Sequence, residues 1–279
     1  MRDVTIGQYY PSNSVVHRAD PRFKLIIMLM YFVMVFFCDS FFSFGFVAVF
    51  VLITILLSRV PILKVLKGIR PVIFVVLFTT ALMIVFYRDS NSEPLCGWWI
   101  FNIYLSGIYA SLKLALRLLL LVMMPTLLTL TSTPTELCDG LESLLKPLKL
   151  IKVPVHELAL IMSIALRLIP TLVDETDKIM NAQKARCAEF DSRNPFKKIK
   201  AMLPVLIPLF VSSFRRADEL ADAMDSRCYR GAKGRTRMKV LKCHVGDVLA
   251  LLFWCVVFVC VLFLKYNWFD WGFIALLGI

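Results

Sequence analysis

The chain has 279 residues, of which 59% are hydrophobic and only 19% are charged. A soluble domain rarely tolerates this balance, so the composition excludes the ordinary soluble classes and indicates a polytopic membrane protein. The formal net charge is +12, and the places of the cations along the chain are more informative than their sum, because cytoplasmic loops of membrane proteins concentrate Lys and Arg.

Two apolar runs near the N-terminus predict a membrane hairpin. Asp20-Pro21 is a good helix start, with Asp as N-cap and proline in the first turn. The apolar runs cover residues 25–38 and 41–57. Each is slightly shorter than the ~20 residues needed to cross a bilayer, and interfacial residues at the ends close the gap.

Two more spans are expected at residues 71–87 and within 104–130. The segment 59–70 has four cations among apolar residues, which suits a short amphipathic segment at the interface. In the fourth span Lys113 and Arg117 share one helix face. Either this face lies in mid-membrane as a functional site, or both cations reach the outer surface.

The distribution of cations predicts the orientation of the spans. Arg88 is the only Lys or Arg in the loops after the first and third spans. The segments before the first span and after the second, by contrast, are rich in Lys and Arg. We therefore expect a cytoplasmic N-terminus. The predicted organisation is a four-span domain (1–130), a cytoplasmic-side helical domain (131–244) and a last span with a tail (245–279).

The middle domain contains signals for three helices. Thr133-Pro134-Thr135-Glu136 is a capping box that opens a short helix to about residue 145. A helix of about 30 residues follows from Pro154 to about Cys187. After a polar link at 190–198, another long helix is expected to end near Gly231, where glycine can supply the C-cap.

Both long helices are apolar at first and amphipathic later, and each has an apolar face on its amphipathic part. The candidate face residues are Leu172, Ile179 and Met180 on the first helix and Phe210, Phe214 and Met224 on the second.

The ends of the two long helices repeat one pattern. In each, an Ile-Pro step is followed by a small-Arg-Cys tripeptide, Ala185-Arg186-Cys187 and Ser226-Arg227-Cys228. An Arg at a helix C-terminus offsets the helix dipole by about 0.3–1 kcal/mol, but that effect does not explain the shared neighbours. A small-Arg-small tip can place its guanidinium in a groove where a carboxylate binds it bidentately. We therefore expect these six residues to dock a partner.

On these motifs the chain resembles the T component (EcfT family) of energy-coupling factor (ECF) transporters, which are ABC-type importers of vitamins and metals. That family has two Ala-Arg-Gly-like motifs at the ends of two long coupling helices. Stretches 8–22, 130–141 and 229–237 are also similar to it. One departure is that Cys187 and Cys228 stand where glycine is usual, which would weaken a helix cap that relied on glycine.

The resemblance implies an all-α membrane protein with about five transmembrane helices and three cytoplasmic-side coupling helices, two of them long and crossed. It implies a multi-pass location in a prokaryotic cell membrane. Two P-loop ATPase subunits (A and A′) would receive the motif arginines, and a substrate-binding S component would pack on the coupling helices. ATP and Mg would be bound by the ATPases and no cofactor by this chain. The function implied is the coupling of ATP hydrolysis to uptake of vitamins or other micronutrients.

No catalytic residue and no metal site are expected in the chain itself. No G-x-x-x-x-G-K-[ST] motif is present, and the three histidines are far apart in sequence. Two other functions remain open. A self-contained secondary transporter would need ionisable residues in mid-membrane. A membrane-anchored binder of nucleic acid or anionic lipid would use the basic run 230–242, but we expect no nucleic-acid partner.

Overall fold

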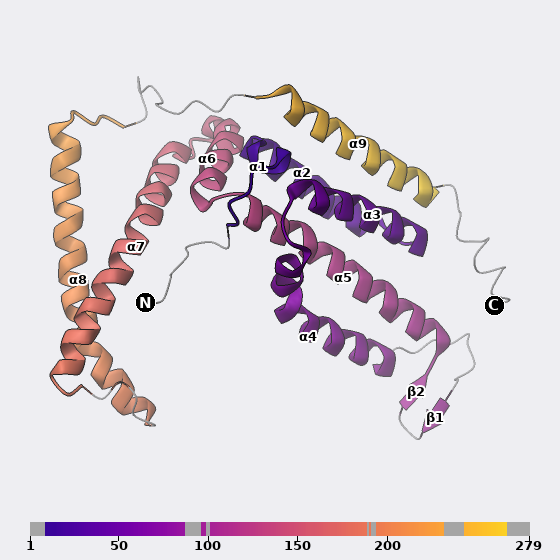
Figure 1. Cartoon of the computed structure of the whole chain (residues 1–279), viewed down its shortest axis with the longest axis horizontal. Coiled ribbons are helices and arrows are strands. Elements are labelled where there is room, and N and C mark those ends of the chain that lie inside the picture. The colour runs from indigo at the N-terminus through magenta and orange to yellow at the C-terminus, as the bar shows by residue number, and fades with distance from the viewer. Residues whose placement is uncertain are drawn as a thin grey trace. The chain divides into compact units, whose positions relative to one another are not determined.

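The chain is almost entirely helical in a computed structural model, which describes residues 9–86, 96–98, 101–188, 190, 194–231 and 243–266. It divides into two compact units. The first holds α1 (Val15–Arg18), α2 (Pro21–Phe37), α3 (Phe41–Ser58), α4 (Ile62–Phe86), the antiparallel hairpin of β1 (Cys96–Trp98) and β2 (Phe101–Ile103), α5 (Leu105–Thr131), nearly all of α6 (Pro134–Leu145) and α9 (Val245–Tyr266). The second holds the 3-10 helix η1 (Lys146–Ile151), α7 (Val155–Ala185) and α8 (Pro195–Ser226), as labelled in Figure 1. The all-α membrane fold is confirmed, with the short hairpin as its one β element among the described residues.

Five of the described helices are long and apolar enough to cross a membrane: α3, α4, α5, α7 and α9. The number of candidate spans agrees with the five that were predicted. The two sets differ because α7 is among the five helices and α2 is not. Helix α2 has 17 residues and so spans about 25 Å at 1.5 Å per residue, which is short for a crossing. Helix α7 qualifies through its apolar first half, although the sequence placed it on the cytoplasmic side.

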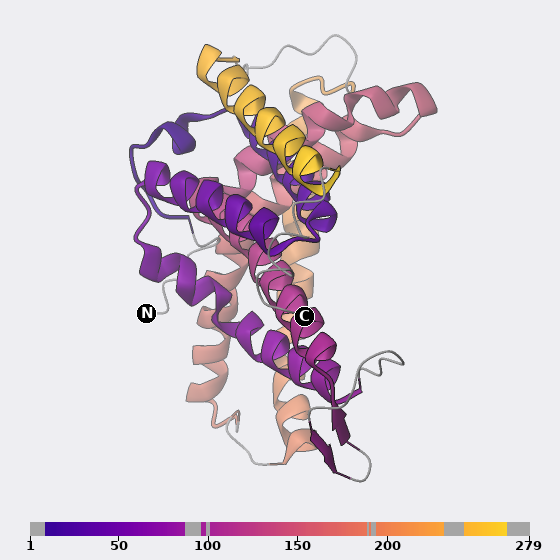
Figure 2. The same cartoon turned by 90° about the vertical axis from the view of Figure 1, so that its right-hand side faces the viewer.

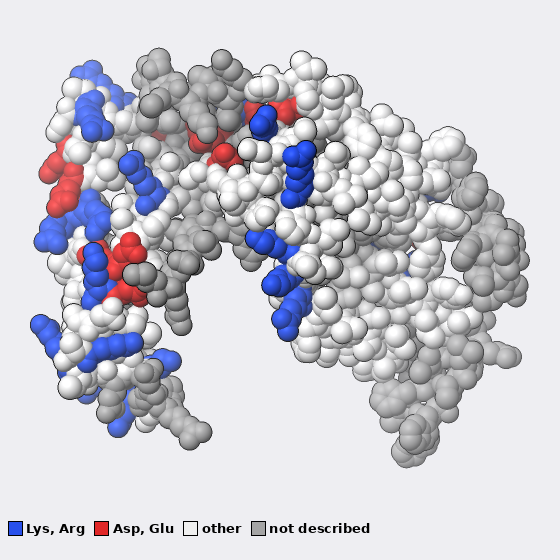
Figure 3. All heavy atoms as spheres, viewed as in Figure 1, with Lys and Arg blue, Asp and Glu red and all other residues white. Residues whose placement is uncertain are grey.

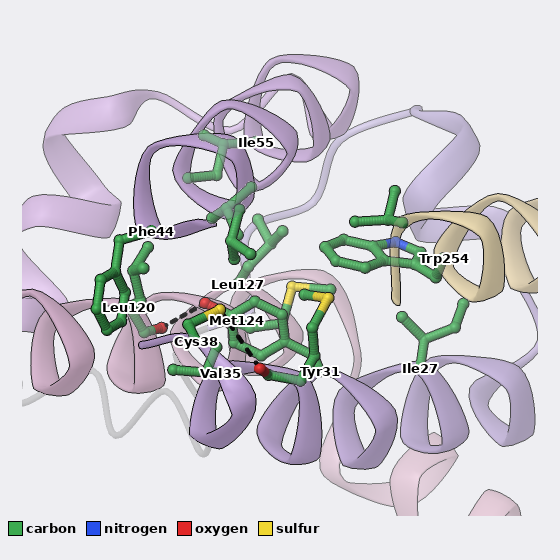
Figure 4. Close-up of a cluster of buried hydrophobic side chains, with 14 of the residues drawn as sticks. Ile27, Tyr31, Val35, Cys38, Phe44, Ile55, Leu120, Met124, Leu127 and Trp254 are labelled. Carbon is green, nitrogen blue, oxygen red and sulfur yellow. Dashed lines mark hydrogen bonds between the residues drawn. The ribbon is translucent and has the colours of Figure 1, made fainter. Parts of the chain in front are cut away.

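The core of the first unit lies where α2, α3, α5 and α9 meet. Tyr31 on α2 is fully buried and donates a hydrogen bond from its hydroxyl to the Leu120 carbonyl on α5 at 2.7 Å (Figure 4). Its ring also packs edge-to-face on Trp254 of α9, with centroids 5.7 Å apart. One side chain therefore links three helices, and its polar atom is satisfied inside an apolar core.

Helix starts follow the predicted caps. The Asp20 side chain accepts a hydrogen bond from the Arg22 N–H at 3.0 Å, and the capping box closes through Thr133 and Glu136 in both directions at 3.3 Å. Asp247, only 4% exposed, accepts from the Asp20 N–H through Oδ1. This carboxylate therefore connects the start of α2 with the start of α9.

Helix α4 continues through Pro71, so most of the predicted amphipathic segment at 59–70 and the predicted third span form one helix, and the interfacial placement of that segment stays a prediction. Val65, Ile69 and Val76 are buried on both sides of the proline, and α4 packs along α5. This packing outweighs the roughly 3 kcal/mol that an interior proline costs. A Cβ at Gly68 would lie only 2.5 Å from Cγ2 of Thr126 on α5, so glycine permits the close approach.

The segment before α2 is held by backbone and imidazole hydrogen bonds. The Tyr10 N–H donates to the Leu130 carbonyl at 2.9 Å. His17 Nε2 lies 3.0 Å from the Tyr10 carbonyl oxygen, which can only accept, so Nε2 carries the proton and Nδ1 accepts from Ser14 Oγ at 2.7 Å. Burial lowers the pKa of His17 below its ordinary value, so a neutral ring fits these contacts.

Arg117 lies near the middle of α5, and its side chain reaches the turn that joins α2 to α3. Its Nη2 donates to the Cys38 carbonyl at 2.6 Å and lies 3.2 Å from Asp39 Oδ1, in the turn between α2 and α3. The two placements left open by the sequence, in mid-membrane or at the outer surface, both stay predictions, but Arg117 has a carboxylate partner in either case.

Charges are distributed unevenly between the two units. In Figure 3 the helices α3, α5 and α9 present a largely white surface, whereas blue and red atoms gather over α7 and α8. Large apolar side chains are also exposed on α4, for example Phe74, which is 75% exposed. Apolar side chains left uncovered on helices of this length are suited to contact with lipid.

Candidate docking site at the tips of two crossing helices

The two long helices α7 and α8 pack against each other and cross (Figures 1 and 2). Helix α7 continues through Pro170, and α8 through Pro204 and Pro208. Asn194 caps α8 by accepting a hydrogen bond from the Phe196 N–H at 3.1 Å. Helix α8 therefore starts at Pro195, inside the stretch predicted as a polar link.

A carboxylate that the sequence analysis did not single out joins the helices at their crossing. Glu175 on α7 accepts a short hydrogen bond from the Ser212 hydroxyl through Oε1. Its Oε2 lies 2.6 Å from Nη2 of Arg216. The sequence signal was weak, because Glu175 sits among other acids on the polar side of α7 and only the fold selects it from them.

The tip of α7 ends in a Schellman motif. The Ala188 N–H donates to the Gln183 carbonyl at 3.1 Å, which is the long bond of the motif. The Cys187 N–H donates to the Lys184 carbonyl at 3.0 Å, which is the inner bond. Cys187 has φ of 62°, in the left-handed region that favours glycine. Arg186 is the C-cap residue just before it.

The tip of α8 has the same geometry. The Tyr229 N–H donates to the Met224 carbonyl at 3.1 Å, and the Cys228 N–H donates to the Asp225 carbonyl at 2.9 Å. Cys228 has φ of 54°. The expectation that Gly231 caps this helix is therefore wrong, because the helix ends at Ser226 and the left-handed position falls on Cys228.

The two motif arginines are presented in the same way. Ala185, Arg186 and Cys187 are exposed, and so are their counterparts Ser226, Arg227 and Cys228. Within the part of the chain that the structure describes, neither guanidinium makes a side-chain hydrogen bond or an ion pair. Each tip therefore offers five N–H donors and a full positive charge to a carboxylate from outside.

The tips lie at opposite ends of the crossed pair. Figure 1 shows the C-terminus of α7 at one end and that of α8 at the other. The arrangement can therefore engage two separate partner surfaces at the same time.

The predicted face residues fall into two groups. Phe210 and Phe214 on α8 are 62% and 66% exposed, with ring centroids 6.3 Å apart. The others, Leu172, Ile179, Met180 and Met224, are half-buried. The two phenylalanines are available to a partner, whereas α8 turns Ser212 and Arg216 toward α7.

No cluster of three or more His, Cys, Asp or Glu side chains suited to a metal ion occurs among the described residues. The basic run 232–242 lies outside the described residues.

Comparison with known proteins gives the family of the chain. The model of the cobalt transport protein family (CbiQ) matches residues 12–238. A protein of Clostridium kluyveri is 49% identical over 272 residues, which cover 98% of this chain and 99% of the relative. One of Ruminiclostridium cellulolyticum is 46% identical over 269 residues, covering 96% and 100%. One of Bacillus subtilis is 45% identical over 241 residues, covering 86% and 90%. All three bear the name energy-coupling factor transporter transmembrane protein EcfT. The chain belongs to the EcfT family of transmembrane T components of energy-coupling factor transporters.

Proposed function

We propose that this chain is the coupling subunit of an ATP-driven importer, in which two cytoplasmic ATPase subunits each receive one helix tip. The observation that carries the proposal is the pair of equivalent tips, each with a Schellman cap and an exposed arginine that has no side-chain partner among the described residues. An ATPase groove lined with carboxylates would bind each guanidinium bidentately. The N-terminus and both tips would then be cytoplasmic.

ATP and Mg would be bound by the ATPases, and a separate S component would hold the substrate. The exposed phenylalanines on α8 and the exposed apolar first half of α7 offer that component an apolar surface. The class of substrate, a vitamin or another micronutrient, would be decided by the S component and not by this chain.

The proposal is tested by the double substitution Arg186→Ala with Arg227→Ala. We expect the variant to insert in the membrane at normal levels, to lose co-purification of the ATPases and to lose ATP-driven uptake. The matched control is Arg167→Ala with Arg215→Ala, which removes one exposed arginine from each helix away from the tips. Retained ATPase binding in the tip variant would refute the docking role, and an active chain without ATPases would favour a secondary transporter.

A further inference from the structure

Three helix ends converge on Asp39, in the turn between α2 and α3. Arg117 on α5 lies 3.2 Å from Asp39 Oδ1, and Lys265 at the end of α9 lies 2.7 Å from Oδ2. Both carboxylate oxygens are therefore occupied by cations. Arg117 Nε, by contrast, is buried without a hydrogen-bond partner among the described residues.

A third cation at this place lacks a carboxylate. Lys113 is half-buried, one helical turn from Arg117, and is in no ion pair with the residues that the structure describes. Its Nζ lies 5.5 Å from the centre of the Phe41 ring. Like charges four residues apart on a helix repel each other, so this pair needs a counterion. Three cations with one carboxylate leave a net charge of +2.

Helices α2 and α9 end at this cluster and α3 begins there, while α5 extends past it by the twelve residues that precede Arg117. Three apolar helices that have an end at one level fit a membrane surface, so the cluster is suited to contact with lipid headgroups. The Arg117 guanidinium lies 5.8 Å from the centre of the Phe44 ring, and Lys265 Nζ lies 5.2 Å from that of Phe37. Cations on apolar stems beside aromatic rings are typical of side chains that reach from hydrocarbon to the interface.

We propose that Lys113, Arg117 and Lys265 form a binding site for the phosphate of an anionic phospholipid headgroup. Phosphate oxygens accept charge-assisted hydrogen bonds from Arg and Lys, and an anion would offset the repulsion between Lys113 and Arg117. Phe37 and Phe42, 40% and 47% exposed, lie beside the cluster in sequence and offer apolar contact to acyl chains. A free phosphate ion has no acyl chain to make these apolar contacts, so they favour a lipid. The site is independent of the docking role proposed for the helix tips.

The test is native mass spectrometry of the full chain in detergent, titrated with palmitoyl-oleoyl phosphatidylglycerol or phosphatidylcholine. Lys113→Gln removes one charge-assisted contact, so we expect about tenfold weaker binding of phosphatidylglycerol. The matched control is Lys67→Gln, which removes an exposed lysine from the first part of α4 and should leave this binding unchanged. Equal losses in both variants would overturn the proposal.

A second variant should act in the opposite direction. Asp39→Asn keeps the shape of the side chain but removes the carboxylate that occupies Arg117 and Lys265, so phosphatidylglycerol should bind more tightly than to the natural chain. Unchanged or weaker binding would overturn the proposal, because it would mean that the cations pair only with Asp39 and do not bind lipid. Excess inorganic phosphate should not displace the lipid. Displacement would assign the site to free phosphate and refute a lipid site.

Discussion

Replacing Cys187 with glycine should tighten the tip of α7. The residue has φ of 62°, where a Cβ costs roughly 1–2 kcal/mol. Glycine avoids this cost but loses up to about 1 kcal/mol through its freer unfolded chain. Because only the last turn opens when the tip frays, we expect a net gain near 1 kcal/mol for the closed cap, which corresponds to an equilibrium constant for opening that is about fivefold smaller.

Hydrogen exchange measures this opening directly. The Cys187 and Ala188 amide groups donate the two bonds of the cap, so their exchange should slow by about that factor in Cys187→Gly. Cys187→Ala is the control, because it removes the thiol but keeps the Cβ and should bring no gain. Cys228→Gly should give the same effect at the other tip. Equal exchange in the glycine and alanine variants would refute the reasoning from backbone conformation.

Two further predictions concern other parts of the chain. Glu175→Ala should loosen the helix crossing, since it removes the bonds to Ser212 and Arg216. The distance between spin labels on the two tip thiols should then have a broader distribution, whereas Glu219→Ala, an exposed acid on α8, should leave it unchanged. A second prediction is that protonation of His17 opposes folding, because burial lowers its folded pKa. Stability should therefore be full above pH 6.5 and fall as the pH drops through the folded pKa, and thermal unfolding of His17→Gln should lack this loss.

The local helix signals were readable because they depend on residues close in sequence. Asp20 and the Thr133–Glu136 box form the caps that their spacing predicts. The continuity of α4 through Pro71 could not be predicted, because it depends on packing against α5, more than 30 residues away in sequence. The preference of glycine for the left-handed conformation also led to a wrong prediction of where α8 is capped. Gly231 is the better residue for a left-handed position, but the motif formed at Cys228.

The candidate site was predicted in part. The pattern of small-Arg-Cys identified the tips, and the structure adds that both have one cap geometry with an exposed arginine. The contact of Glu175 with Ser212 and Arg216 joins residues about 40 positions apart. Such a contact depends on how two helices cross, and no sequence period indicates it.

The most direct test of the central claim uses the chain's own thiols. Cys187 and Cys228 are exposed beside Arg186 and Arg227, the arginines proposed to dock the ATPases, so a maleimide should label both in the isolated chain. Binding of the two ATPase subunits should protect both thiols, while Cys243, which is also exposed, serves as the internal reference. Protection of both tips relative to Cys243 is the predicted result, and unchanged labelling of both tips in a complex that contains the ATPases would contradict the account.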